Sequence, residues 1–220
     1  MGIIHTFLDF LHQLGDLELL KGLFNQYGNM IFLIMFIIIF AETGFVVTPF
    51  LPGDSLLFGA GIVVGLGGLN IYVLFAILVL AAVFGNIVNY SIGRWLGPSI
   101  LEKEKIPFIK KKHLESTHKY YEKNGAFAII IGRFTPFIRT FVPFVAGIGY
   151  MDRKKFISYT IIGAIAWVTP FLLGGYFLSS IPWVQEHFKK ITTTILIISV
   201  LPFLYGIAKE VFAKKETEKV

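Results

Sequence analysis

Residues 41–61 read AETGFVVTPFLPGDSLLFGAG, an apolar stretch with a carboxylate on each side of an interrupted middle. The two acids are Glu42 and Asp54, and the helix-breaking residues between them are Pro49, Pro52 and Gly53. Proline removes a backbone donor, and irregular backbone at membrane depth is tolerated only where it is buried in protein or lines a cavity. The stretch therefore predicts a re-entrant helical hairpin, within residues 28–66, that brings both acids to a similar depth.

A second interrupted apolar stretch occupies residues 132–147 and reads GRFTPFIRTFVPFVAG. It carries two cations, Arg133 and Arg139, and two breakers, Pro136 and Pro143. Its Thr-Pro-Phe also repeats the Thr-Pro-Phe of the first stretch. We therefore predict a second re-entrant hairpin, within residues 125–149, that faces the first.

The composition places these charges in a membrane. The chain has 220 residues, of which 55% are hydrophobic, and it contains 23 Phe. Three long stretches lack any Asp, Glu, Lys or Arg: residues 55–93, 156–185 and 191–208. Since about 20 apolar residues cross the hydrocarbon layer, transmembrane helices are predicted at residues 71–97, 155–179 and 190–209. The whole chain is predicted to be one all-α membrane domain.

Small and polar residues recur along the first two predicted spans. In the first span they occupy every fourth position: Gly85, Asn89, Gly93 and Gly97. The second span has a similar rhythm: Tyr159, Gly163, Trp167 and Gly174. Such stripes let another helix approach closely. Pro170 in addition predicts a kink in the second span.

Basic residues decide the predicted orientation. The connector, residues 98–124, holds seven lysines and the tail, residues 210–220, holds three more, in a chain with a net charge of +6. Cytoplasmic segments carry such an excess, so both segments and the C-terminus are predicted inside. Residues 1–27 are expected to form an amphipathic helix at the interface. One hairpin then enters from each side, which makes the two halves inverted repeats of the kind that secondary transporters use.

The two acids are candidates for proton coupling. A low-dielectric environment disfavours the charged form of a carboxylate, so Glu42 and Asp54 are expected to exchange protons near neutral pH. Two simpler interpretations remain open. Asp54 opens an apolar run after Pro-Gly, where Asp is a favoured helix N-cap. Glu42 would be unremarkable as a carboxylate that faces water at the interface.

The arginines of the second hairpin are candidates for binding phosphate. Arginine stays charged and grips phosphate with a planar fork of donors, so Arg133 and Arg139 are expected to hold the phosphate of a lipid. The alternative is that they only neutralise the two acids as structural ion pairs. Arg94, beside Trp95 at the end of the first span, is expected to snorkel to the interface.

No enzymatic activity, cofactor or metal is predicted. The chain has no cysteine, which excludes disulfides, iron–sulfur centres and thiol catalysis. A lipid-phosphate phosphatase would need a nucleophile, usually a histidine among basic residues. None of the five histidines lies in a predicted hairpin, and His113 and His118 lack further ligands for a metal.

The quoted stretches resemble the signature blocks of the DedA family of membrane proteins, which is related to the SNARE-associated or VTT domain proteins of eukaryotes. The likeness extends from about Asn25 to Ala208 and includes the GRWLG that ends the first span. It implies a bacterial cytoplasmic-membrane protein with opposed re-entrant hairpins and a role in lipid transport. The resemblance further implies recycling of undecaprenyl phosphate or movement of phospholipids, dependence on the proton motive force, and functional roles for both acids and both hairpin arginines.

Residues and resemblance together predict a proton-linked lipid flippase. Its partners would be protons and a phosphate-bearing lipid, either undecaprenyl phosphate or a phospholipid, and no nucleic acid. The alternative is a proton-coupled cation antiporter, in which the acids bind the ion and the arginines only balance charge. The identity of the lipid, the direction of transport and the oligomeric state stay open, a homo-oligomer included.

Overall fold

The computed structural model describes residues 17–45, 53–67, 69–102, 124–125 and 127–195. Within these residues every regular element is a helix, which confirms the predicted all-α class. Shorter helical runs also occur at residues 127–132 and 188–195. The helices are α2 (Leu17–Tyr27), α3 (Met30–Gly44), α4 (Gly53–Gly65), α5 (Ile71–Glu102), α7 (Pro136–Ile148), α8 (Arg153–Leu178) and α9 (Pro182–Glu186).

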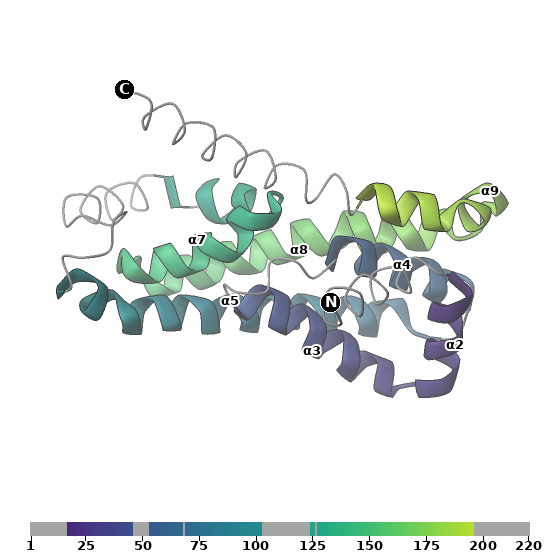
Figure 1. Cartoon of the computed structure of the whole chain (residues 1–220), viewed down its shortest axis with the longest axis horizontal. Coiled ribbons are helices and arrows are strands. Elements are labelled where there is room, and N and C mark those ends of the chain that lie inside the picture. Colours follow the sequence, from purple (N-terminus) through teal and green to yellow (C-terminus); the bar gives the residue numbers. More distant parts are fainter. Residues whose placement is uncertain (1–16, 46–52, 68, 103–123, 126, 196–220) are drawn as a thin grey trace, which may run out of the picture.

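Two helices, α5 and α8, are long and apolar enough to cross a membrane. Their apolar parts are Ile71–Gly97, of 27 residues, and Arg153–Leu178, of 26 residues, which corresponds to about 40 Å of helix. Both run along the long axis of the molecule (Figure 1). These helices confirm the first two predicted spans. The predicted span at residues 190–209 lies mostly outside the described residues, as do the connector and the tail.

Three other apolar helices are too short to cross alone. α3, α4 and α7 have 15, 13 and 13 residues, or about 20 Å each, whereas the hydrocarbon layer measures about 30 Å. α7 begins at Pro136, where the missing N–H of proline costs nothing. α4 begins at Gly53. Pro49 and Pro52, the other predicted break points of the first hairpin, lie outside the described residues.

Pro143 does not break the second apolar stretch. α7 continues through it to Ile148, so the prediction of a break point at Pro143 is wrong. In membrane helices the backbone groups that a proline leaves unsatisfied are supported by neighbouring helices. Pro143 leaves the Arg139 carbonyl without its usual i+4 donor; Asn89 of α5 donates from Nδ2 to the adjacent Thr140 carbonyl at 2.8 Å and so connects the same turn of α7 to α5.

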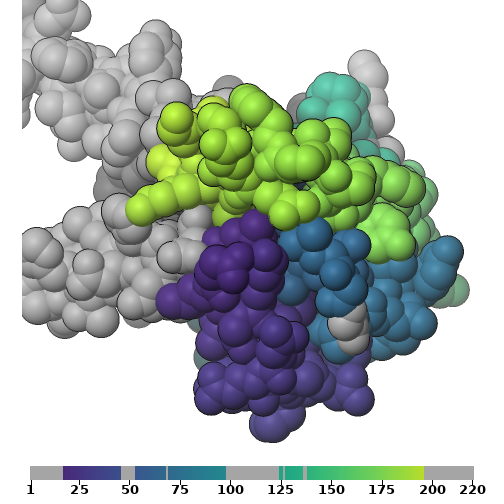
Figure 2. Space-filling model, turned by 90° about the vertical axis from the view of Figure 1, so that its right-hand side faces the viewer, coloured from purple at the N-terminus to yellow at the C-terminus, as the bar shows by residue number. Residues whose placement is uncertain are grey.

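α2 is amphipathic, as predicted for this part of the N-terminal region, and its apolar face packs on protein. Leu17, Leu20 and Phe24 are buried, and Leu20 reaches Gly59 of α4. Figure 2 shows α2, in purple, against the blue surface of α4 at one end of the molecule. α2 and α3 meet at 120° and add a third crossing if they count as one bent span. Residues 1–16 lie outside the described part.

Glycines let the helices approach closely. A Cβ on Gly93 of α5 would collide with the Phe144 carbonyl of α7, and one on Gly147 of α7 would collide with the Tyr90 carbonyl of α5. Gly85 lies in the same way against Thr43 at the end of α3. The predicted stripe of small residues on α5 is therefore confirmed.

α4 and α8 pack through a second pair of glycines. A Cβ on Gly61 would collide with the Leu172 carbonyl, and one on Gly175 with the Phe58 carbonyl. The predicted place of Gly174 in this stripe is wrong, because no described residue lies within 4 Å of the position that a Cβ on Gly174 would take. The buried face of α8 proceeds by steps of three and four residues through Val168 and Leu172 to Gly175.

These adjacent glycines supply a matched test of the packing. Gly175→Ala is expected to destabilise the protein by about 1–3 kcal/mol, because its methyl group pushes the α4 backbone away. Gly174→Ala should be neutral or stabilising by up to about 1 kcal/mol, since alanine is the better helix former. Thermal unfolding of the two purified variants compares them directly. Equal melting temperatures would contradict the close contact of α4 with α8.

Candidate functional site

The structure gathers the predicted acids and arginines into one buried group, which we call the charge cluster: Glu42, Asp54, Arg133 and Arg139. Their exposed fractions are 0%, 7%, 3% and 6%. They come from the last turn of α3, the first turn of α4, the turn that precedes α7, and the first turn of α7. With all four ionised the cluster is formally neutral.

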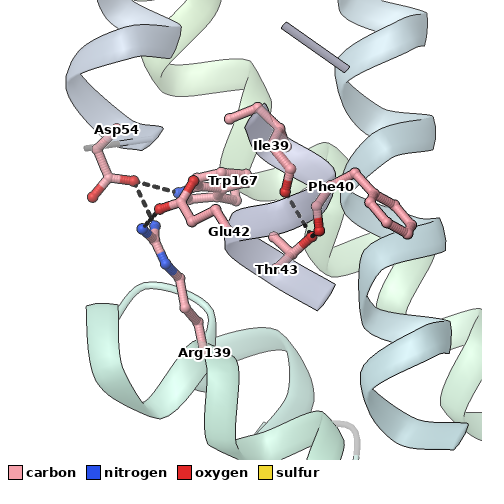
Figure 3. Close-up of polar contacts among 7 residues, drawn as sticks. All are labelled: Ile39, Phe40, Glu42, Thr43, Asp54, Arg139 and Trp167. Carbon is pink, nitrogen blue, oxygen red and sulfur yellow. Dashed lines mark hydrogen bonds and ion pairs between the residues drawn. The ribbon is translucent and has the colours of Figure 1, made fainter. Parts of the chain in front are cut away.

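Arg139 joins both acids. Its Nη1 donates to Asp54 Oδ1 at 2.8 Å, and its Nη2 donates to Glu42 Oε1. Figure 3 shows the guanidinium of Arg139 between the two carboxylates. One side chain of α7 thus ties the end of α3 to the start of α4. Buried ions are unfavourable unless they are paired, so the two buried carboxylates are stabilised only while Arg139 stays in place.

The helix ends explain why these charges depend on one another. Glu42 lies at the C-terminal end of α3 and Arg139 at the N-terminal end of α7, where the helix dipoles disfavour a negative and a positive charge respectively. Asp54, in the first turn of α4, occupies a favourable position. The ion pair between Glu42 and Arg139 offsets two unfavourable placements at once.

Gly53 lets α4 begin directly beside Glu42. A Cβ at residue 53 would collide with the Glu42 carboxylate. Gly53 therefore begins α4 and leaves room at that start for a carboxylate from α3. A larger residue at position 53 would require the Glu42 carboxylate to shift from this place.

Arg133 differs from Arg139 in its partners. Its Nη2 donates to the Ala82 carbonyl of α5 at 3.2 Å. Its Nη1 is buried and has no hydrogen-bond partner among the residues that the structure describes. A buried donor without a partner is unfavourable by about 1–3 kcal/mol. Arg133 is thus a buried cation with donor capacity left for a ligand.

Trp167 completes the group from the middle of α8. Its Nε1 donates to Asp54 Oδ1 at 2.8 Å. The guanidinium carbons of Arg139 and Arg133 lie 5.1 and 5.7 Å from the centroid of its ring, within the range of cation–π attraction. The spacing of Trp167 in the sequence predicts only helix packing. The signal for a polar role is that a tryptophan buried in a span needs an acceptor for its N–H.

Asn89 is a second polar contact that the sequence analysis had assigned only to packing. Its Nδ2 donates to the carbonyls of Thr43 on α3, at 3.1 Å, and of Thr140 on α7, at 2.8 Å. These two helices carry Glu42 and Arg139. The amide of Asn89 therefore holds the two helices together from the side of α5, next to the charge cluster.

Arg94 does not join the charge cluster. It is exposed, donates from Nη1 to Tyr90 Oη at 2.8 Å, and lies 5.2 Å from the ring centroid of Tyr150. Tyr90 in turn donates to the Met151 carbonyl. Arg94 thus braces the end of α5 against the segment between α7 and α8, at the exposed position expected of a snorkelling arginine.

The chemistry available in the charge cluster is ionic. In the described part of the chain no three His, Cys, Asp or Glu side chains are grouped to hold a metal ion. Two arginines face one indole ring, two acids share one arginine, and Nη1 of Arg133 and Nε of Arg139 are buried without a partner among the described residues. Such a group is able to bind an anion, and a proton on either acid would weaken the hold on Arg139.

Comparisons with known proteins agree with the sequence blocks and the fold. The family model described as VTT domain matches residues 51–177. The chain is 42% identical over 204 residues to Protein DedA of Escherichia coli K12, which covers 92% of each chain. It is 39% identical over 196 residues to an uncharacterized membrane protein of Mycobacterium tuberculosis, covering 88% of this chain and 86% of the relative.

A more distant relative names the compartment. The chain is 31% identical over 184 residues to the inner membrane protein YghB of Escherichia coli K12, covering 84% of each chain. No solved structure gives a significant match. The matched family model and the extent of these similarities show that the chain is a membrane protein of the DedA family, with a VTT domain.

Proposed function

We propose that the protein is a proton-linked lipid transporter of the bacterial cytoplasmic membrane, with its lysine-rich connector and C-terminus inside. It moves a phosphate-bearing lipid, undecaprenyl phosphate or a phospholipid, between leaflets. One observation carries the proposal: a buried cluster of two acids and two arginines in which the acids hold Arg139, while Nη1 of Arg133 has no partner in the part of the chain that the structure describes. Ionisable groups at membrane depth mark the path of an ion or a substrate.

Arg133 is the proposed first ligand of the phosphate. Its guanidinium has a planar fork of donors that matches two phosphate oxygens, and its Nη1 is unused among the described residues. Arg139 is the second ligand once it leaves the acids. The acyl or prenyl chain stays in the surrounding lipid while the headgroup passes through the protein.

The acids are the proposed site of proton coupling. A proton on Glu42 or Asp54 removes one of the two charges that hold Arg139, which makes the arginine more readily available to phosphate. Loss of the proton restores the ion pairs and expels the phosphate. Substrate and acid thus compete for the same guanidinium, which links proton binding to lipid binding.

We further propose that the short helices form two re-entrant hairpins within inverted repeats. Each repeat then holds one hairpin and one span, α3–α4 with α5 in the first and residues 127–132 and α7 with α8 in the second. The glycine contacts support this pairing, since α4 packs on α8 of the other repeat just as α7 packs on α5, each through reciprocal glycine and carbonyl contacts. The two hairpins meet at the charge cluster, as broken helices meet in secondary transporters.

A proton-coupled cation antiporter remains the second candidate. The observation in its favour is that Arg139 contacts both acids directly, as expected if the arginines only balance charge.

We propose transport rather than phosphate hydrolysis for a chemical reason. Hydrolysis needs a nucleophile, and His187, the histidine within the described residues, lies at the C-terminal end of α9 and not in the charge cluster. It stacks on the exposed Trp183 with ring centroids 4.6 Å apart.

Native mass spectrometry tests the proposed substrate class. The wild-type protein is expected to retain a phosphate-bearing lipid on purification, and Arg133→Met is expected to lose it. A dye that reports proton exchange for Na⁺ or K⁺ in protein-containing vesicles tests the antiporter. Cation-dependent proton flux, together with no retained phosphate lipid, would replace the transporter proposal by the antiporter.

The amide variants of the two acids test proton coupling. Glu42→Gln and Asp54→Asn are expected to lose transport stimulated by a proton gradient, because an amide keeps the shape but cannot change its charge. Lipid binding should survive in part, since Arg133 is untouched. Lipid transport by each variant, with and without an imposed gradient, is the measurement. Wild-type behaviour of Asp54→Asn alone would assign Asp54 the role of a helix cap, because Asn caps about as well as Asp.

A further inference from the structure

Trp167 is buried in an unusual place for a tryptophan. The chain has three tryptophans, and two of them, Trp95 and Trp183, are 78% and 60% exposed. Trp167, in the middle of α8, is 1% exposed. Its ring therefore lies wholly within the protein, at the level of the charge cluster and on the helix that packs along α4 (Figure 3).

The contacts of Trp167 are directed at the charges. Oδ1 of Asp54 accepts two bonds of 2.8 Å, one from Arg139 Nη1 and the other from Trp167 Nε1. The guanidinium carbons of both arginines lie within 5.7 Å of the centroid of its ring. Trp167 thus contacts three of the four members of the charge cluster, whereas a tryptophan that only fills space would need none of them.

We propose that Trp167 is the positioning residue of the transport site, an inference that rests on the proposed function. Its indole N–H holds Asp54 in place when Arg139 turns from the acids to a bound phosphate. Its ring keeps Arg133 and Arg139 side by side, so that both guanidiniums meet one phosphate group. Trp167 acts through these residues and itself stays away from the lipid.

The physical need for such a residue follows from the exchange of partners. When Arg139 leaves, Asp54 Oδ1 loses a charge-assisted donor inside the protein, and a buried polar group without a donor is unfavourable. The bond from Trp167 remains through the exchange and lowers this penalty. Two guanidiniums also repel each other, and a shared aromatic face attracts both. Less of the binding energy of the phosphate is then needed to hold the guanidiniums of Arg133 and Arg139 side by side.

Two substitutions separate the roles of the N–H and the ring. Trp167→Phe keeps an aromatic face and removes the N–H, so the maximal rate of lipid transport should fall about 10- to 100-fold while KM stays within about twofold. Trp167→Leu removes the face as well, so KM should also rise. The measurement is the initial rate of movement of a fluorescent phosphatidylethanolamine in vesicles of phosphatidylcholine, against probe concentration. Trp183→Phe is the matched control and should leave both parameters unchanged.

Two results of this kinetic test would overturn the proposal. One is a wild-type maximal rate in Trp167→Phe. The other is an equal loss in both variants that follows the loss of folded protein, measured by size-exclusion chromatography, because a pure packing role predicts that parallel.

A label on the native ring covers the case in which the substitutions impair folding. 5-Fluorotryptophan incorporated into the Trp95→Phe/Trp183→Phe protein places a single ¹⁹F nucleus at Trp167. The ¹⁹F resonance is expected to shift when Asp54→Asn removes the acceptor's charge and when Arg139→Lys removes a guanidinium. It should stay in place in Arg94→Lys. An unchanged resonance in the first two variants would overturn the positioning role.

The label also separates the two claims. If the wild-type protein moves no lipid, the proposed function fails. The ¹⁹F shifts, which require no transport, still decide whether Trp167 positions Asp54 and the arginines.

Discussion

Arg139→Met is expected to destabilise the protein by about 3–5 kcal/mol and to abolish transport, because it leaves two buried acids without their shared cation. The exposed Arg94→Met is the matched control and should change stability by about 1 kcal/mol at most. Adding Glu42→Gln to Arg139→Met should recover part of the stability and none of the transport, since one unpaired charge is removed while the phosphate ligand stays absent. Thermal unfolding in one fixed detergent measures the stability of the three variants, and lipid movement in vesicles measures their transport.

The outcome that would contradict this account of Arg139 is a melting temperature in Arg139→Met equal to that of the wild type. The contacts to both carboxylates would then contribute nothing to the fold. Competition between acid and phosphate for this arginine would lose its structural basis.

Arg133→Lys is expected to reduce transport about 10- to 100-fold and to leave stability within about 1 kcal/mol of the wild type. Lysine keeps the charge and is able to donate to the Ala82 carbonyl, which is the hydrogen bond that Arg133 makes among the described residues. It cannot supply the planar fork that a phosphate accepts. Initial transport rates in vesicles with equal amounts of protein measure the first effect, and thermal unfolding measures the second.

Comparison of the two arginines sharpens the test. Arg139→Lys should lose both transport and stability, because one ammonium group replaces two donors that reach two different acids. Arg133→Lys should lose transport alone. Full transport by both lysine variants would mean that the arginines only balance charge, as in the antiporter.

The sequence predicts which charged residues come together, because charges within apolar segments must find one another. Glu42, Asp54, Arg133 and Arg139 all lie in interrupted apolar stretches, and the cost of removing them from water is offset only where opposite charges pair. The two long spans were predictable for a related reason: each has enough apolar residues to cross the membrane, with few charges within it.

The division of labour between the arginines was not predictable. It depends on where the turn before α7 places residue 133 relative to residue 139, and a shift of a few ångströms decides which guanidinium reaches the acids. The sequence treats both arginines alike. The structure pairs Arg139 with both acids and directs Arg133 to a backbone carbonyl.

The two errors in helix geometry have physical causes. Gly174 and Gly175 differ by about 100° around α8, and sequence spacing alone does not say which of two adjacent glycines faces α4. Pro143 lies within α7, and the turn before it is packed against α5, where Asn89 donates to the Thr140 carbonyl. Neither tertiary contact is visible in the local sequence.

Lipid movement in reconstituted vesicles tests the central claim most directly. Purified protein in phosphatidylcholine vesicles receives a fluorescent phosphatidylethanolamine or, as the matched probe without phosphate, a fluorescent glucosylceramide, and dithionite then reports exposure at the outer leaflet. The account predicts movement of the phosphate-bearing probe alone, stimulated by an imposed proton gradient and lost in Arg133→Lys. Equal movement of both probes, unaffected by the gradient and by Arg133→Lys, would contradict it.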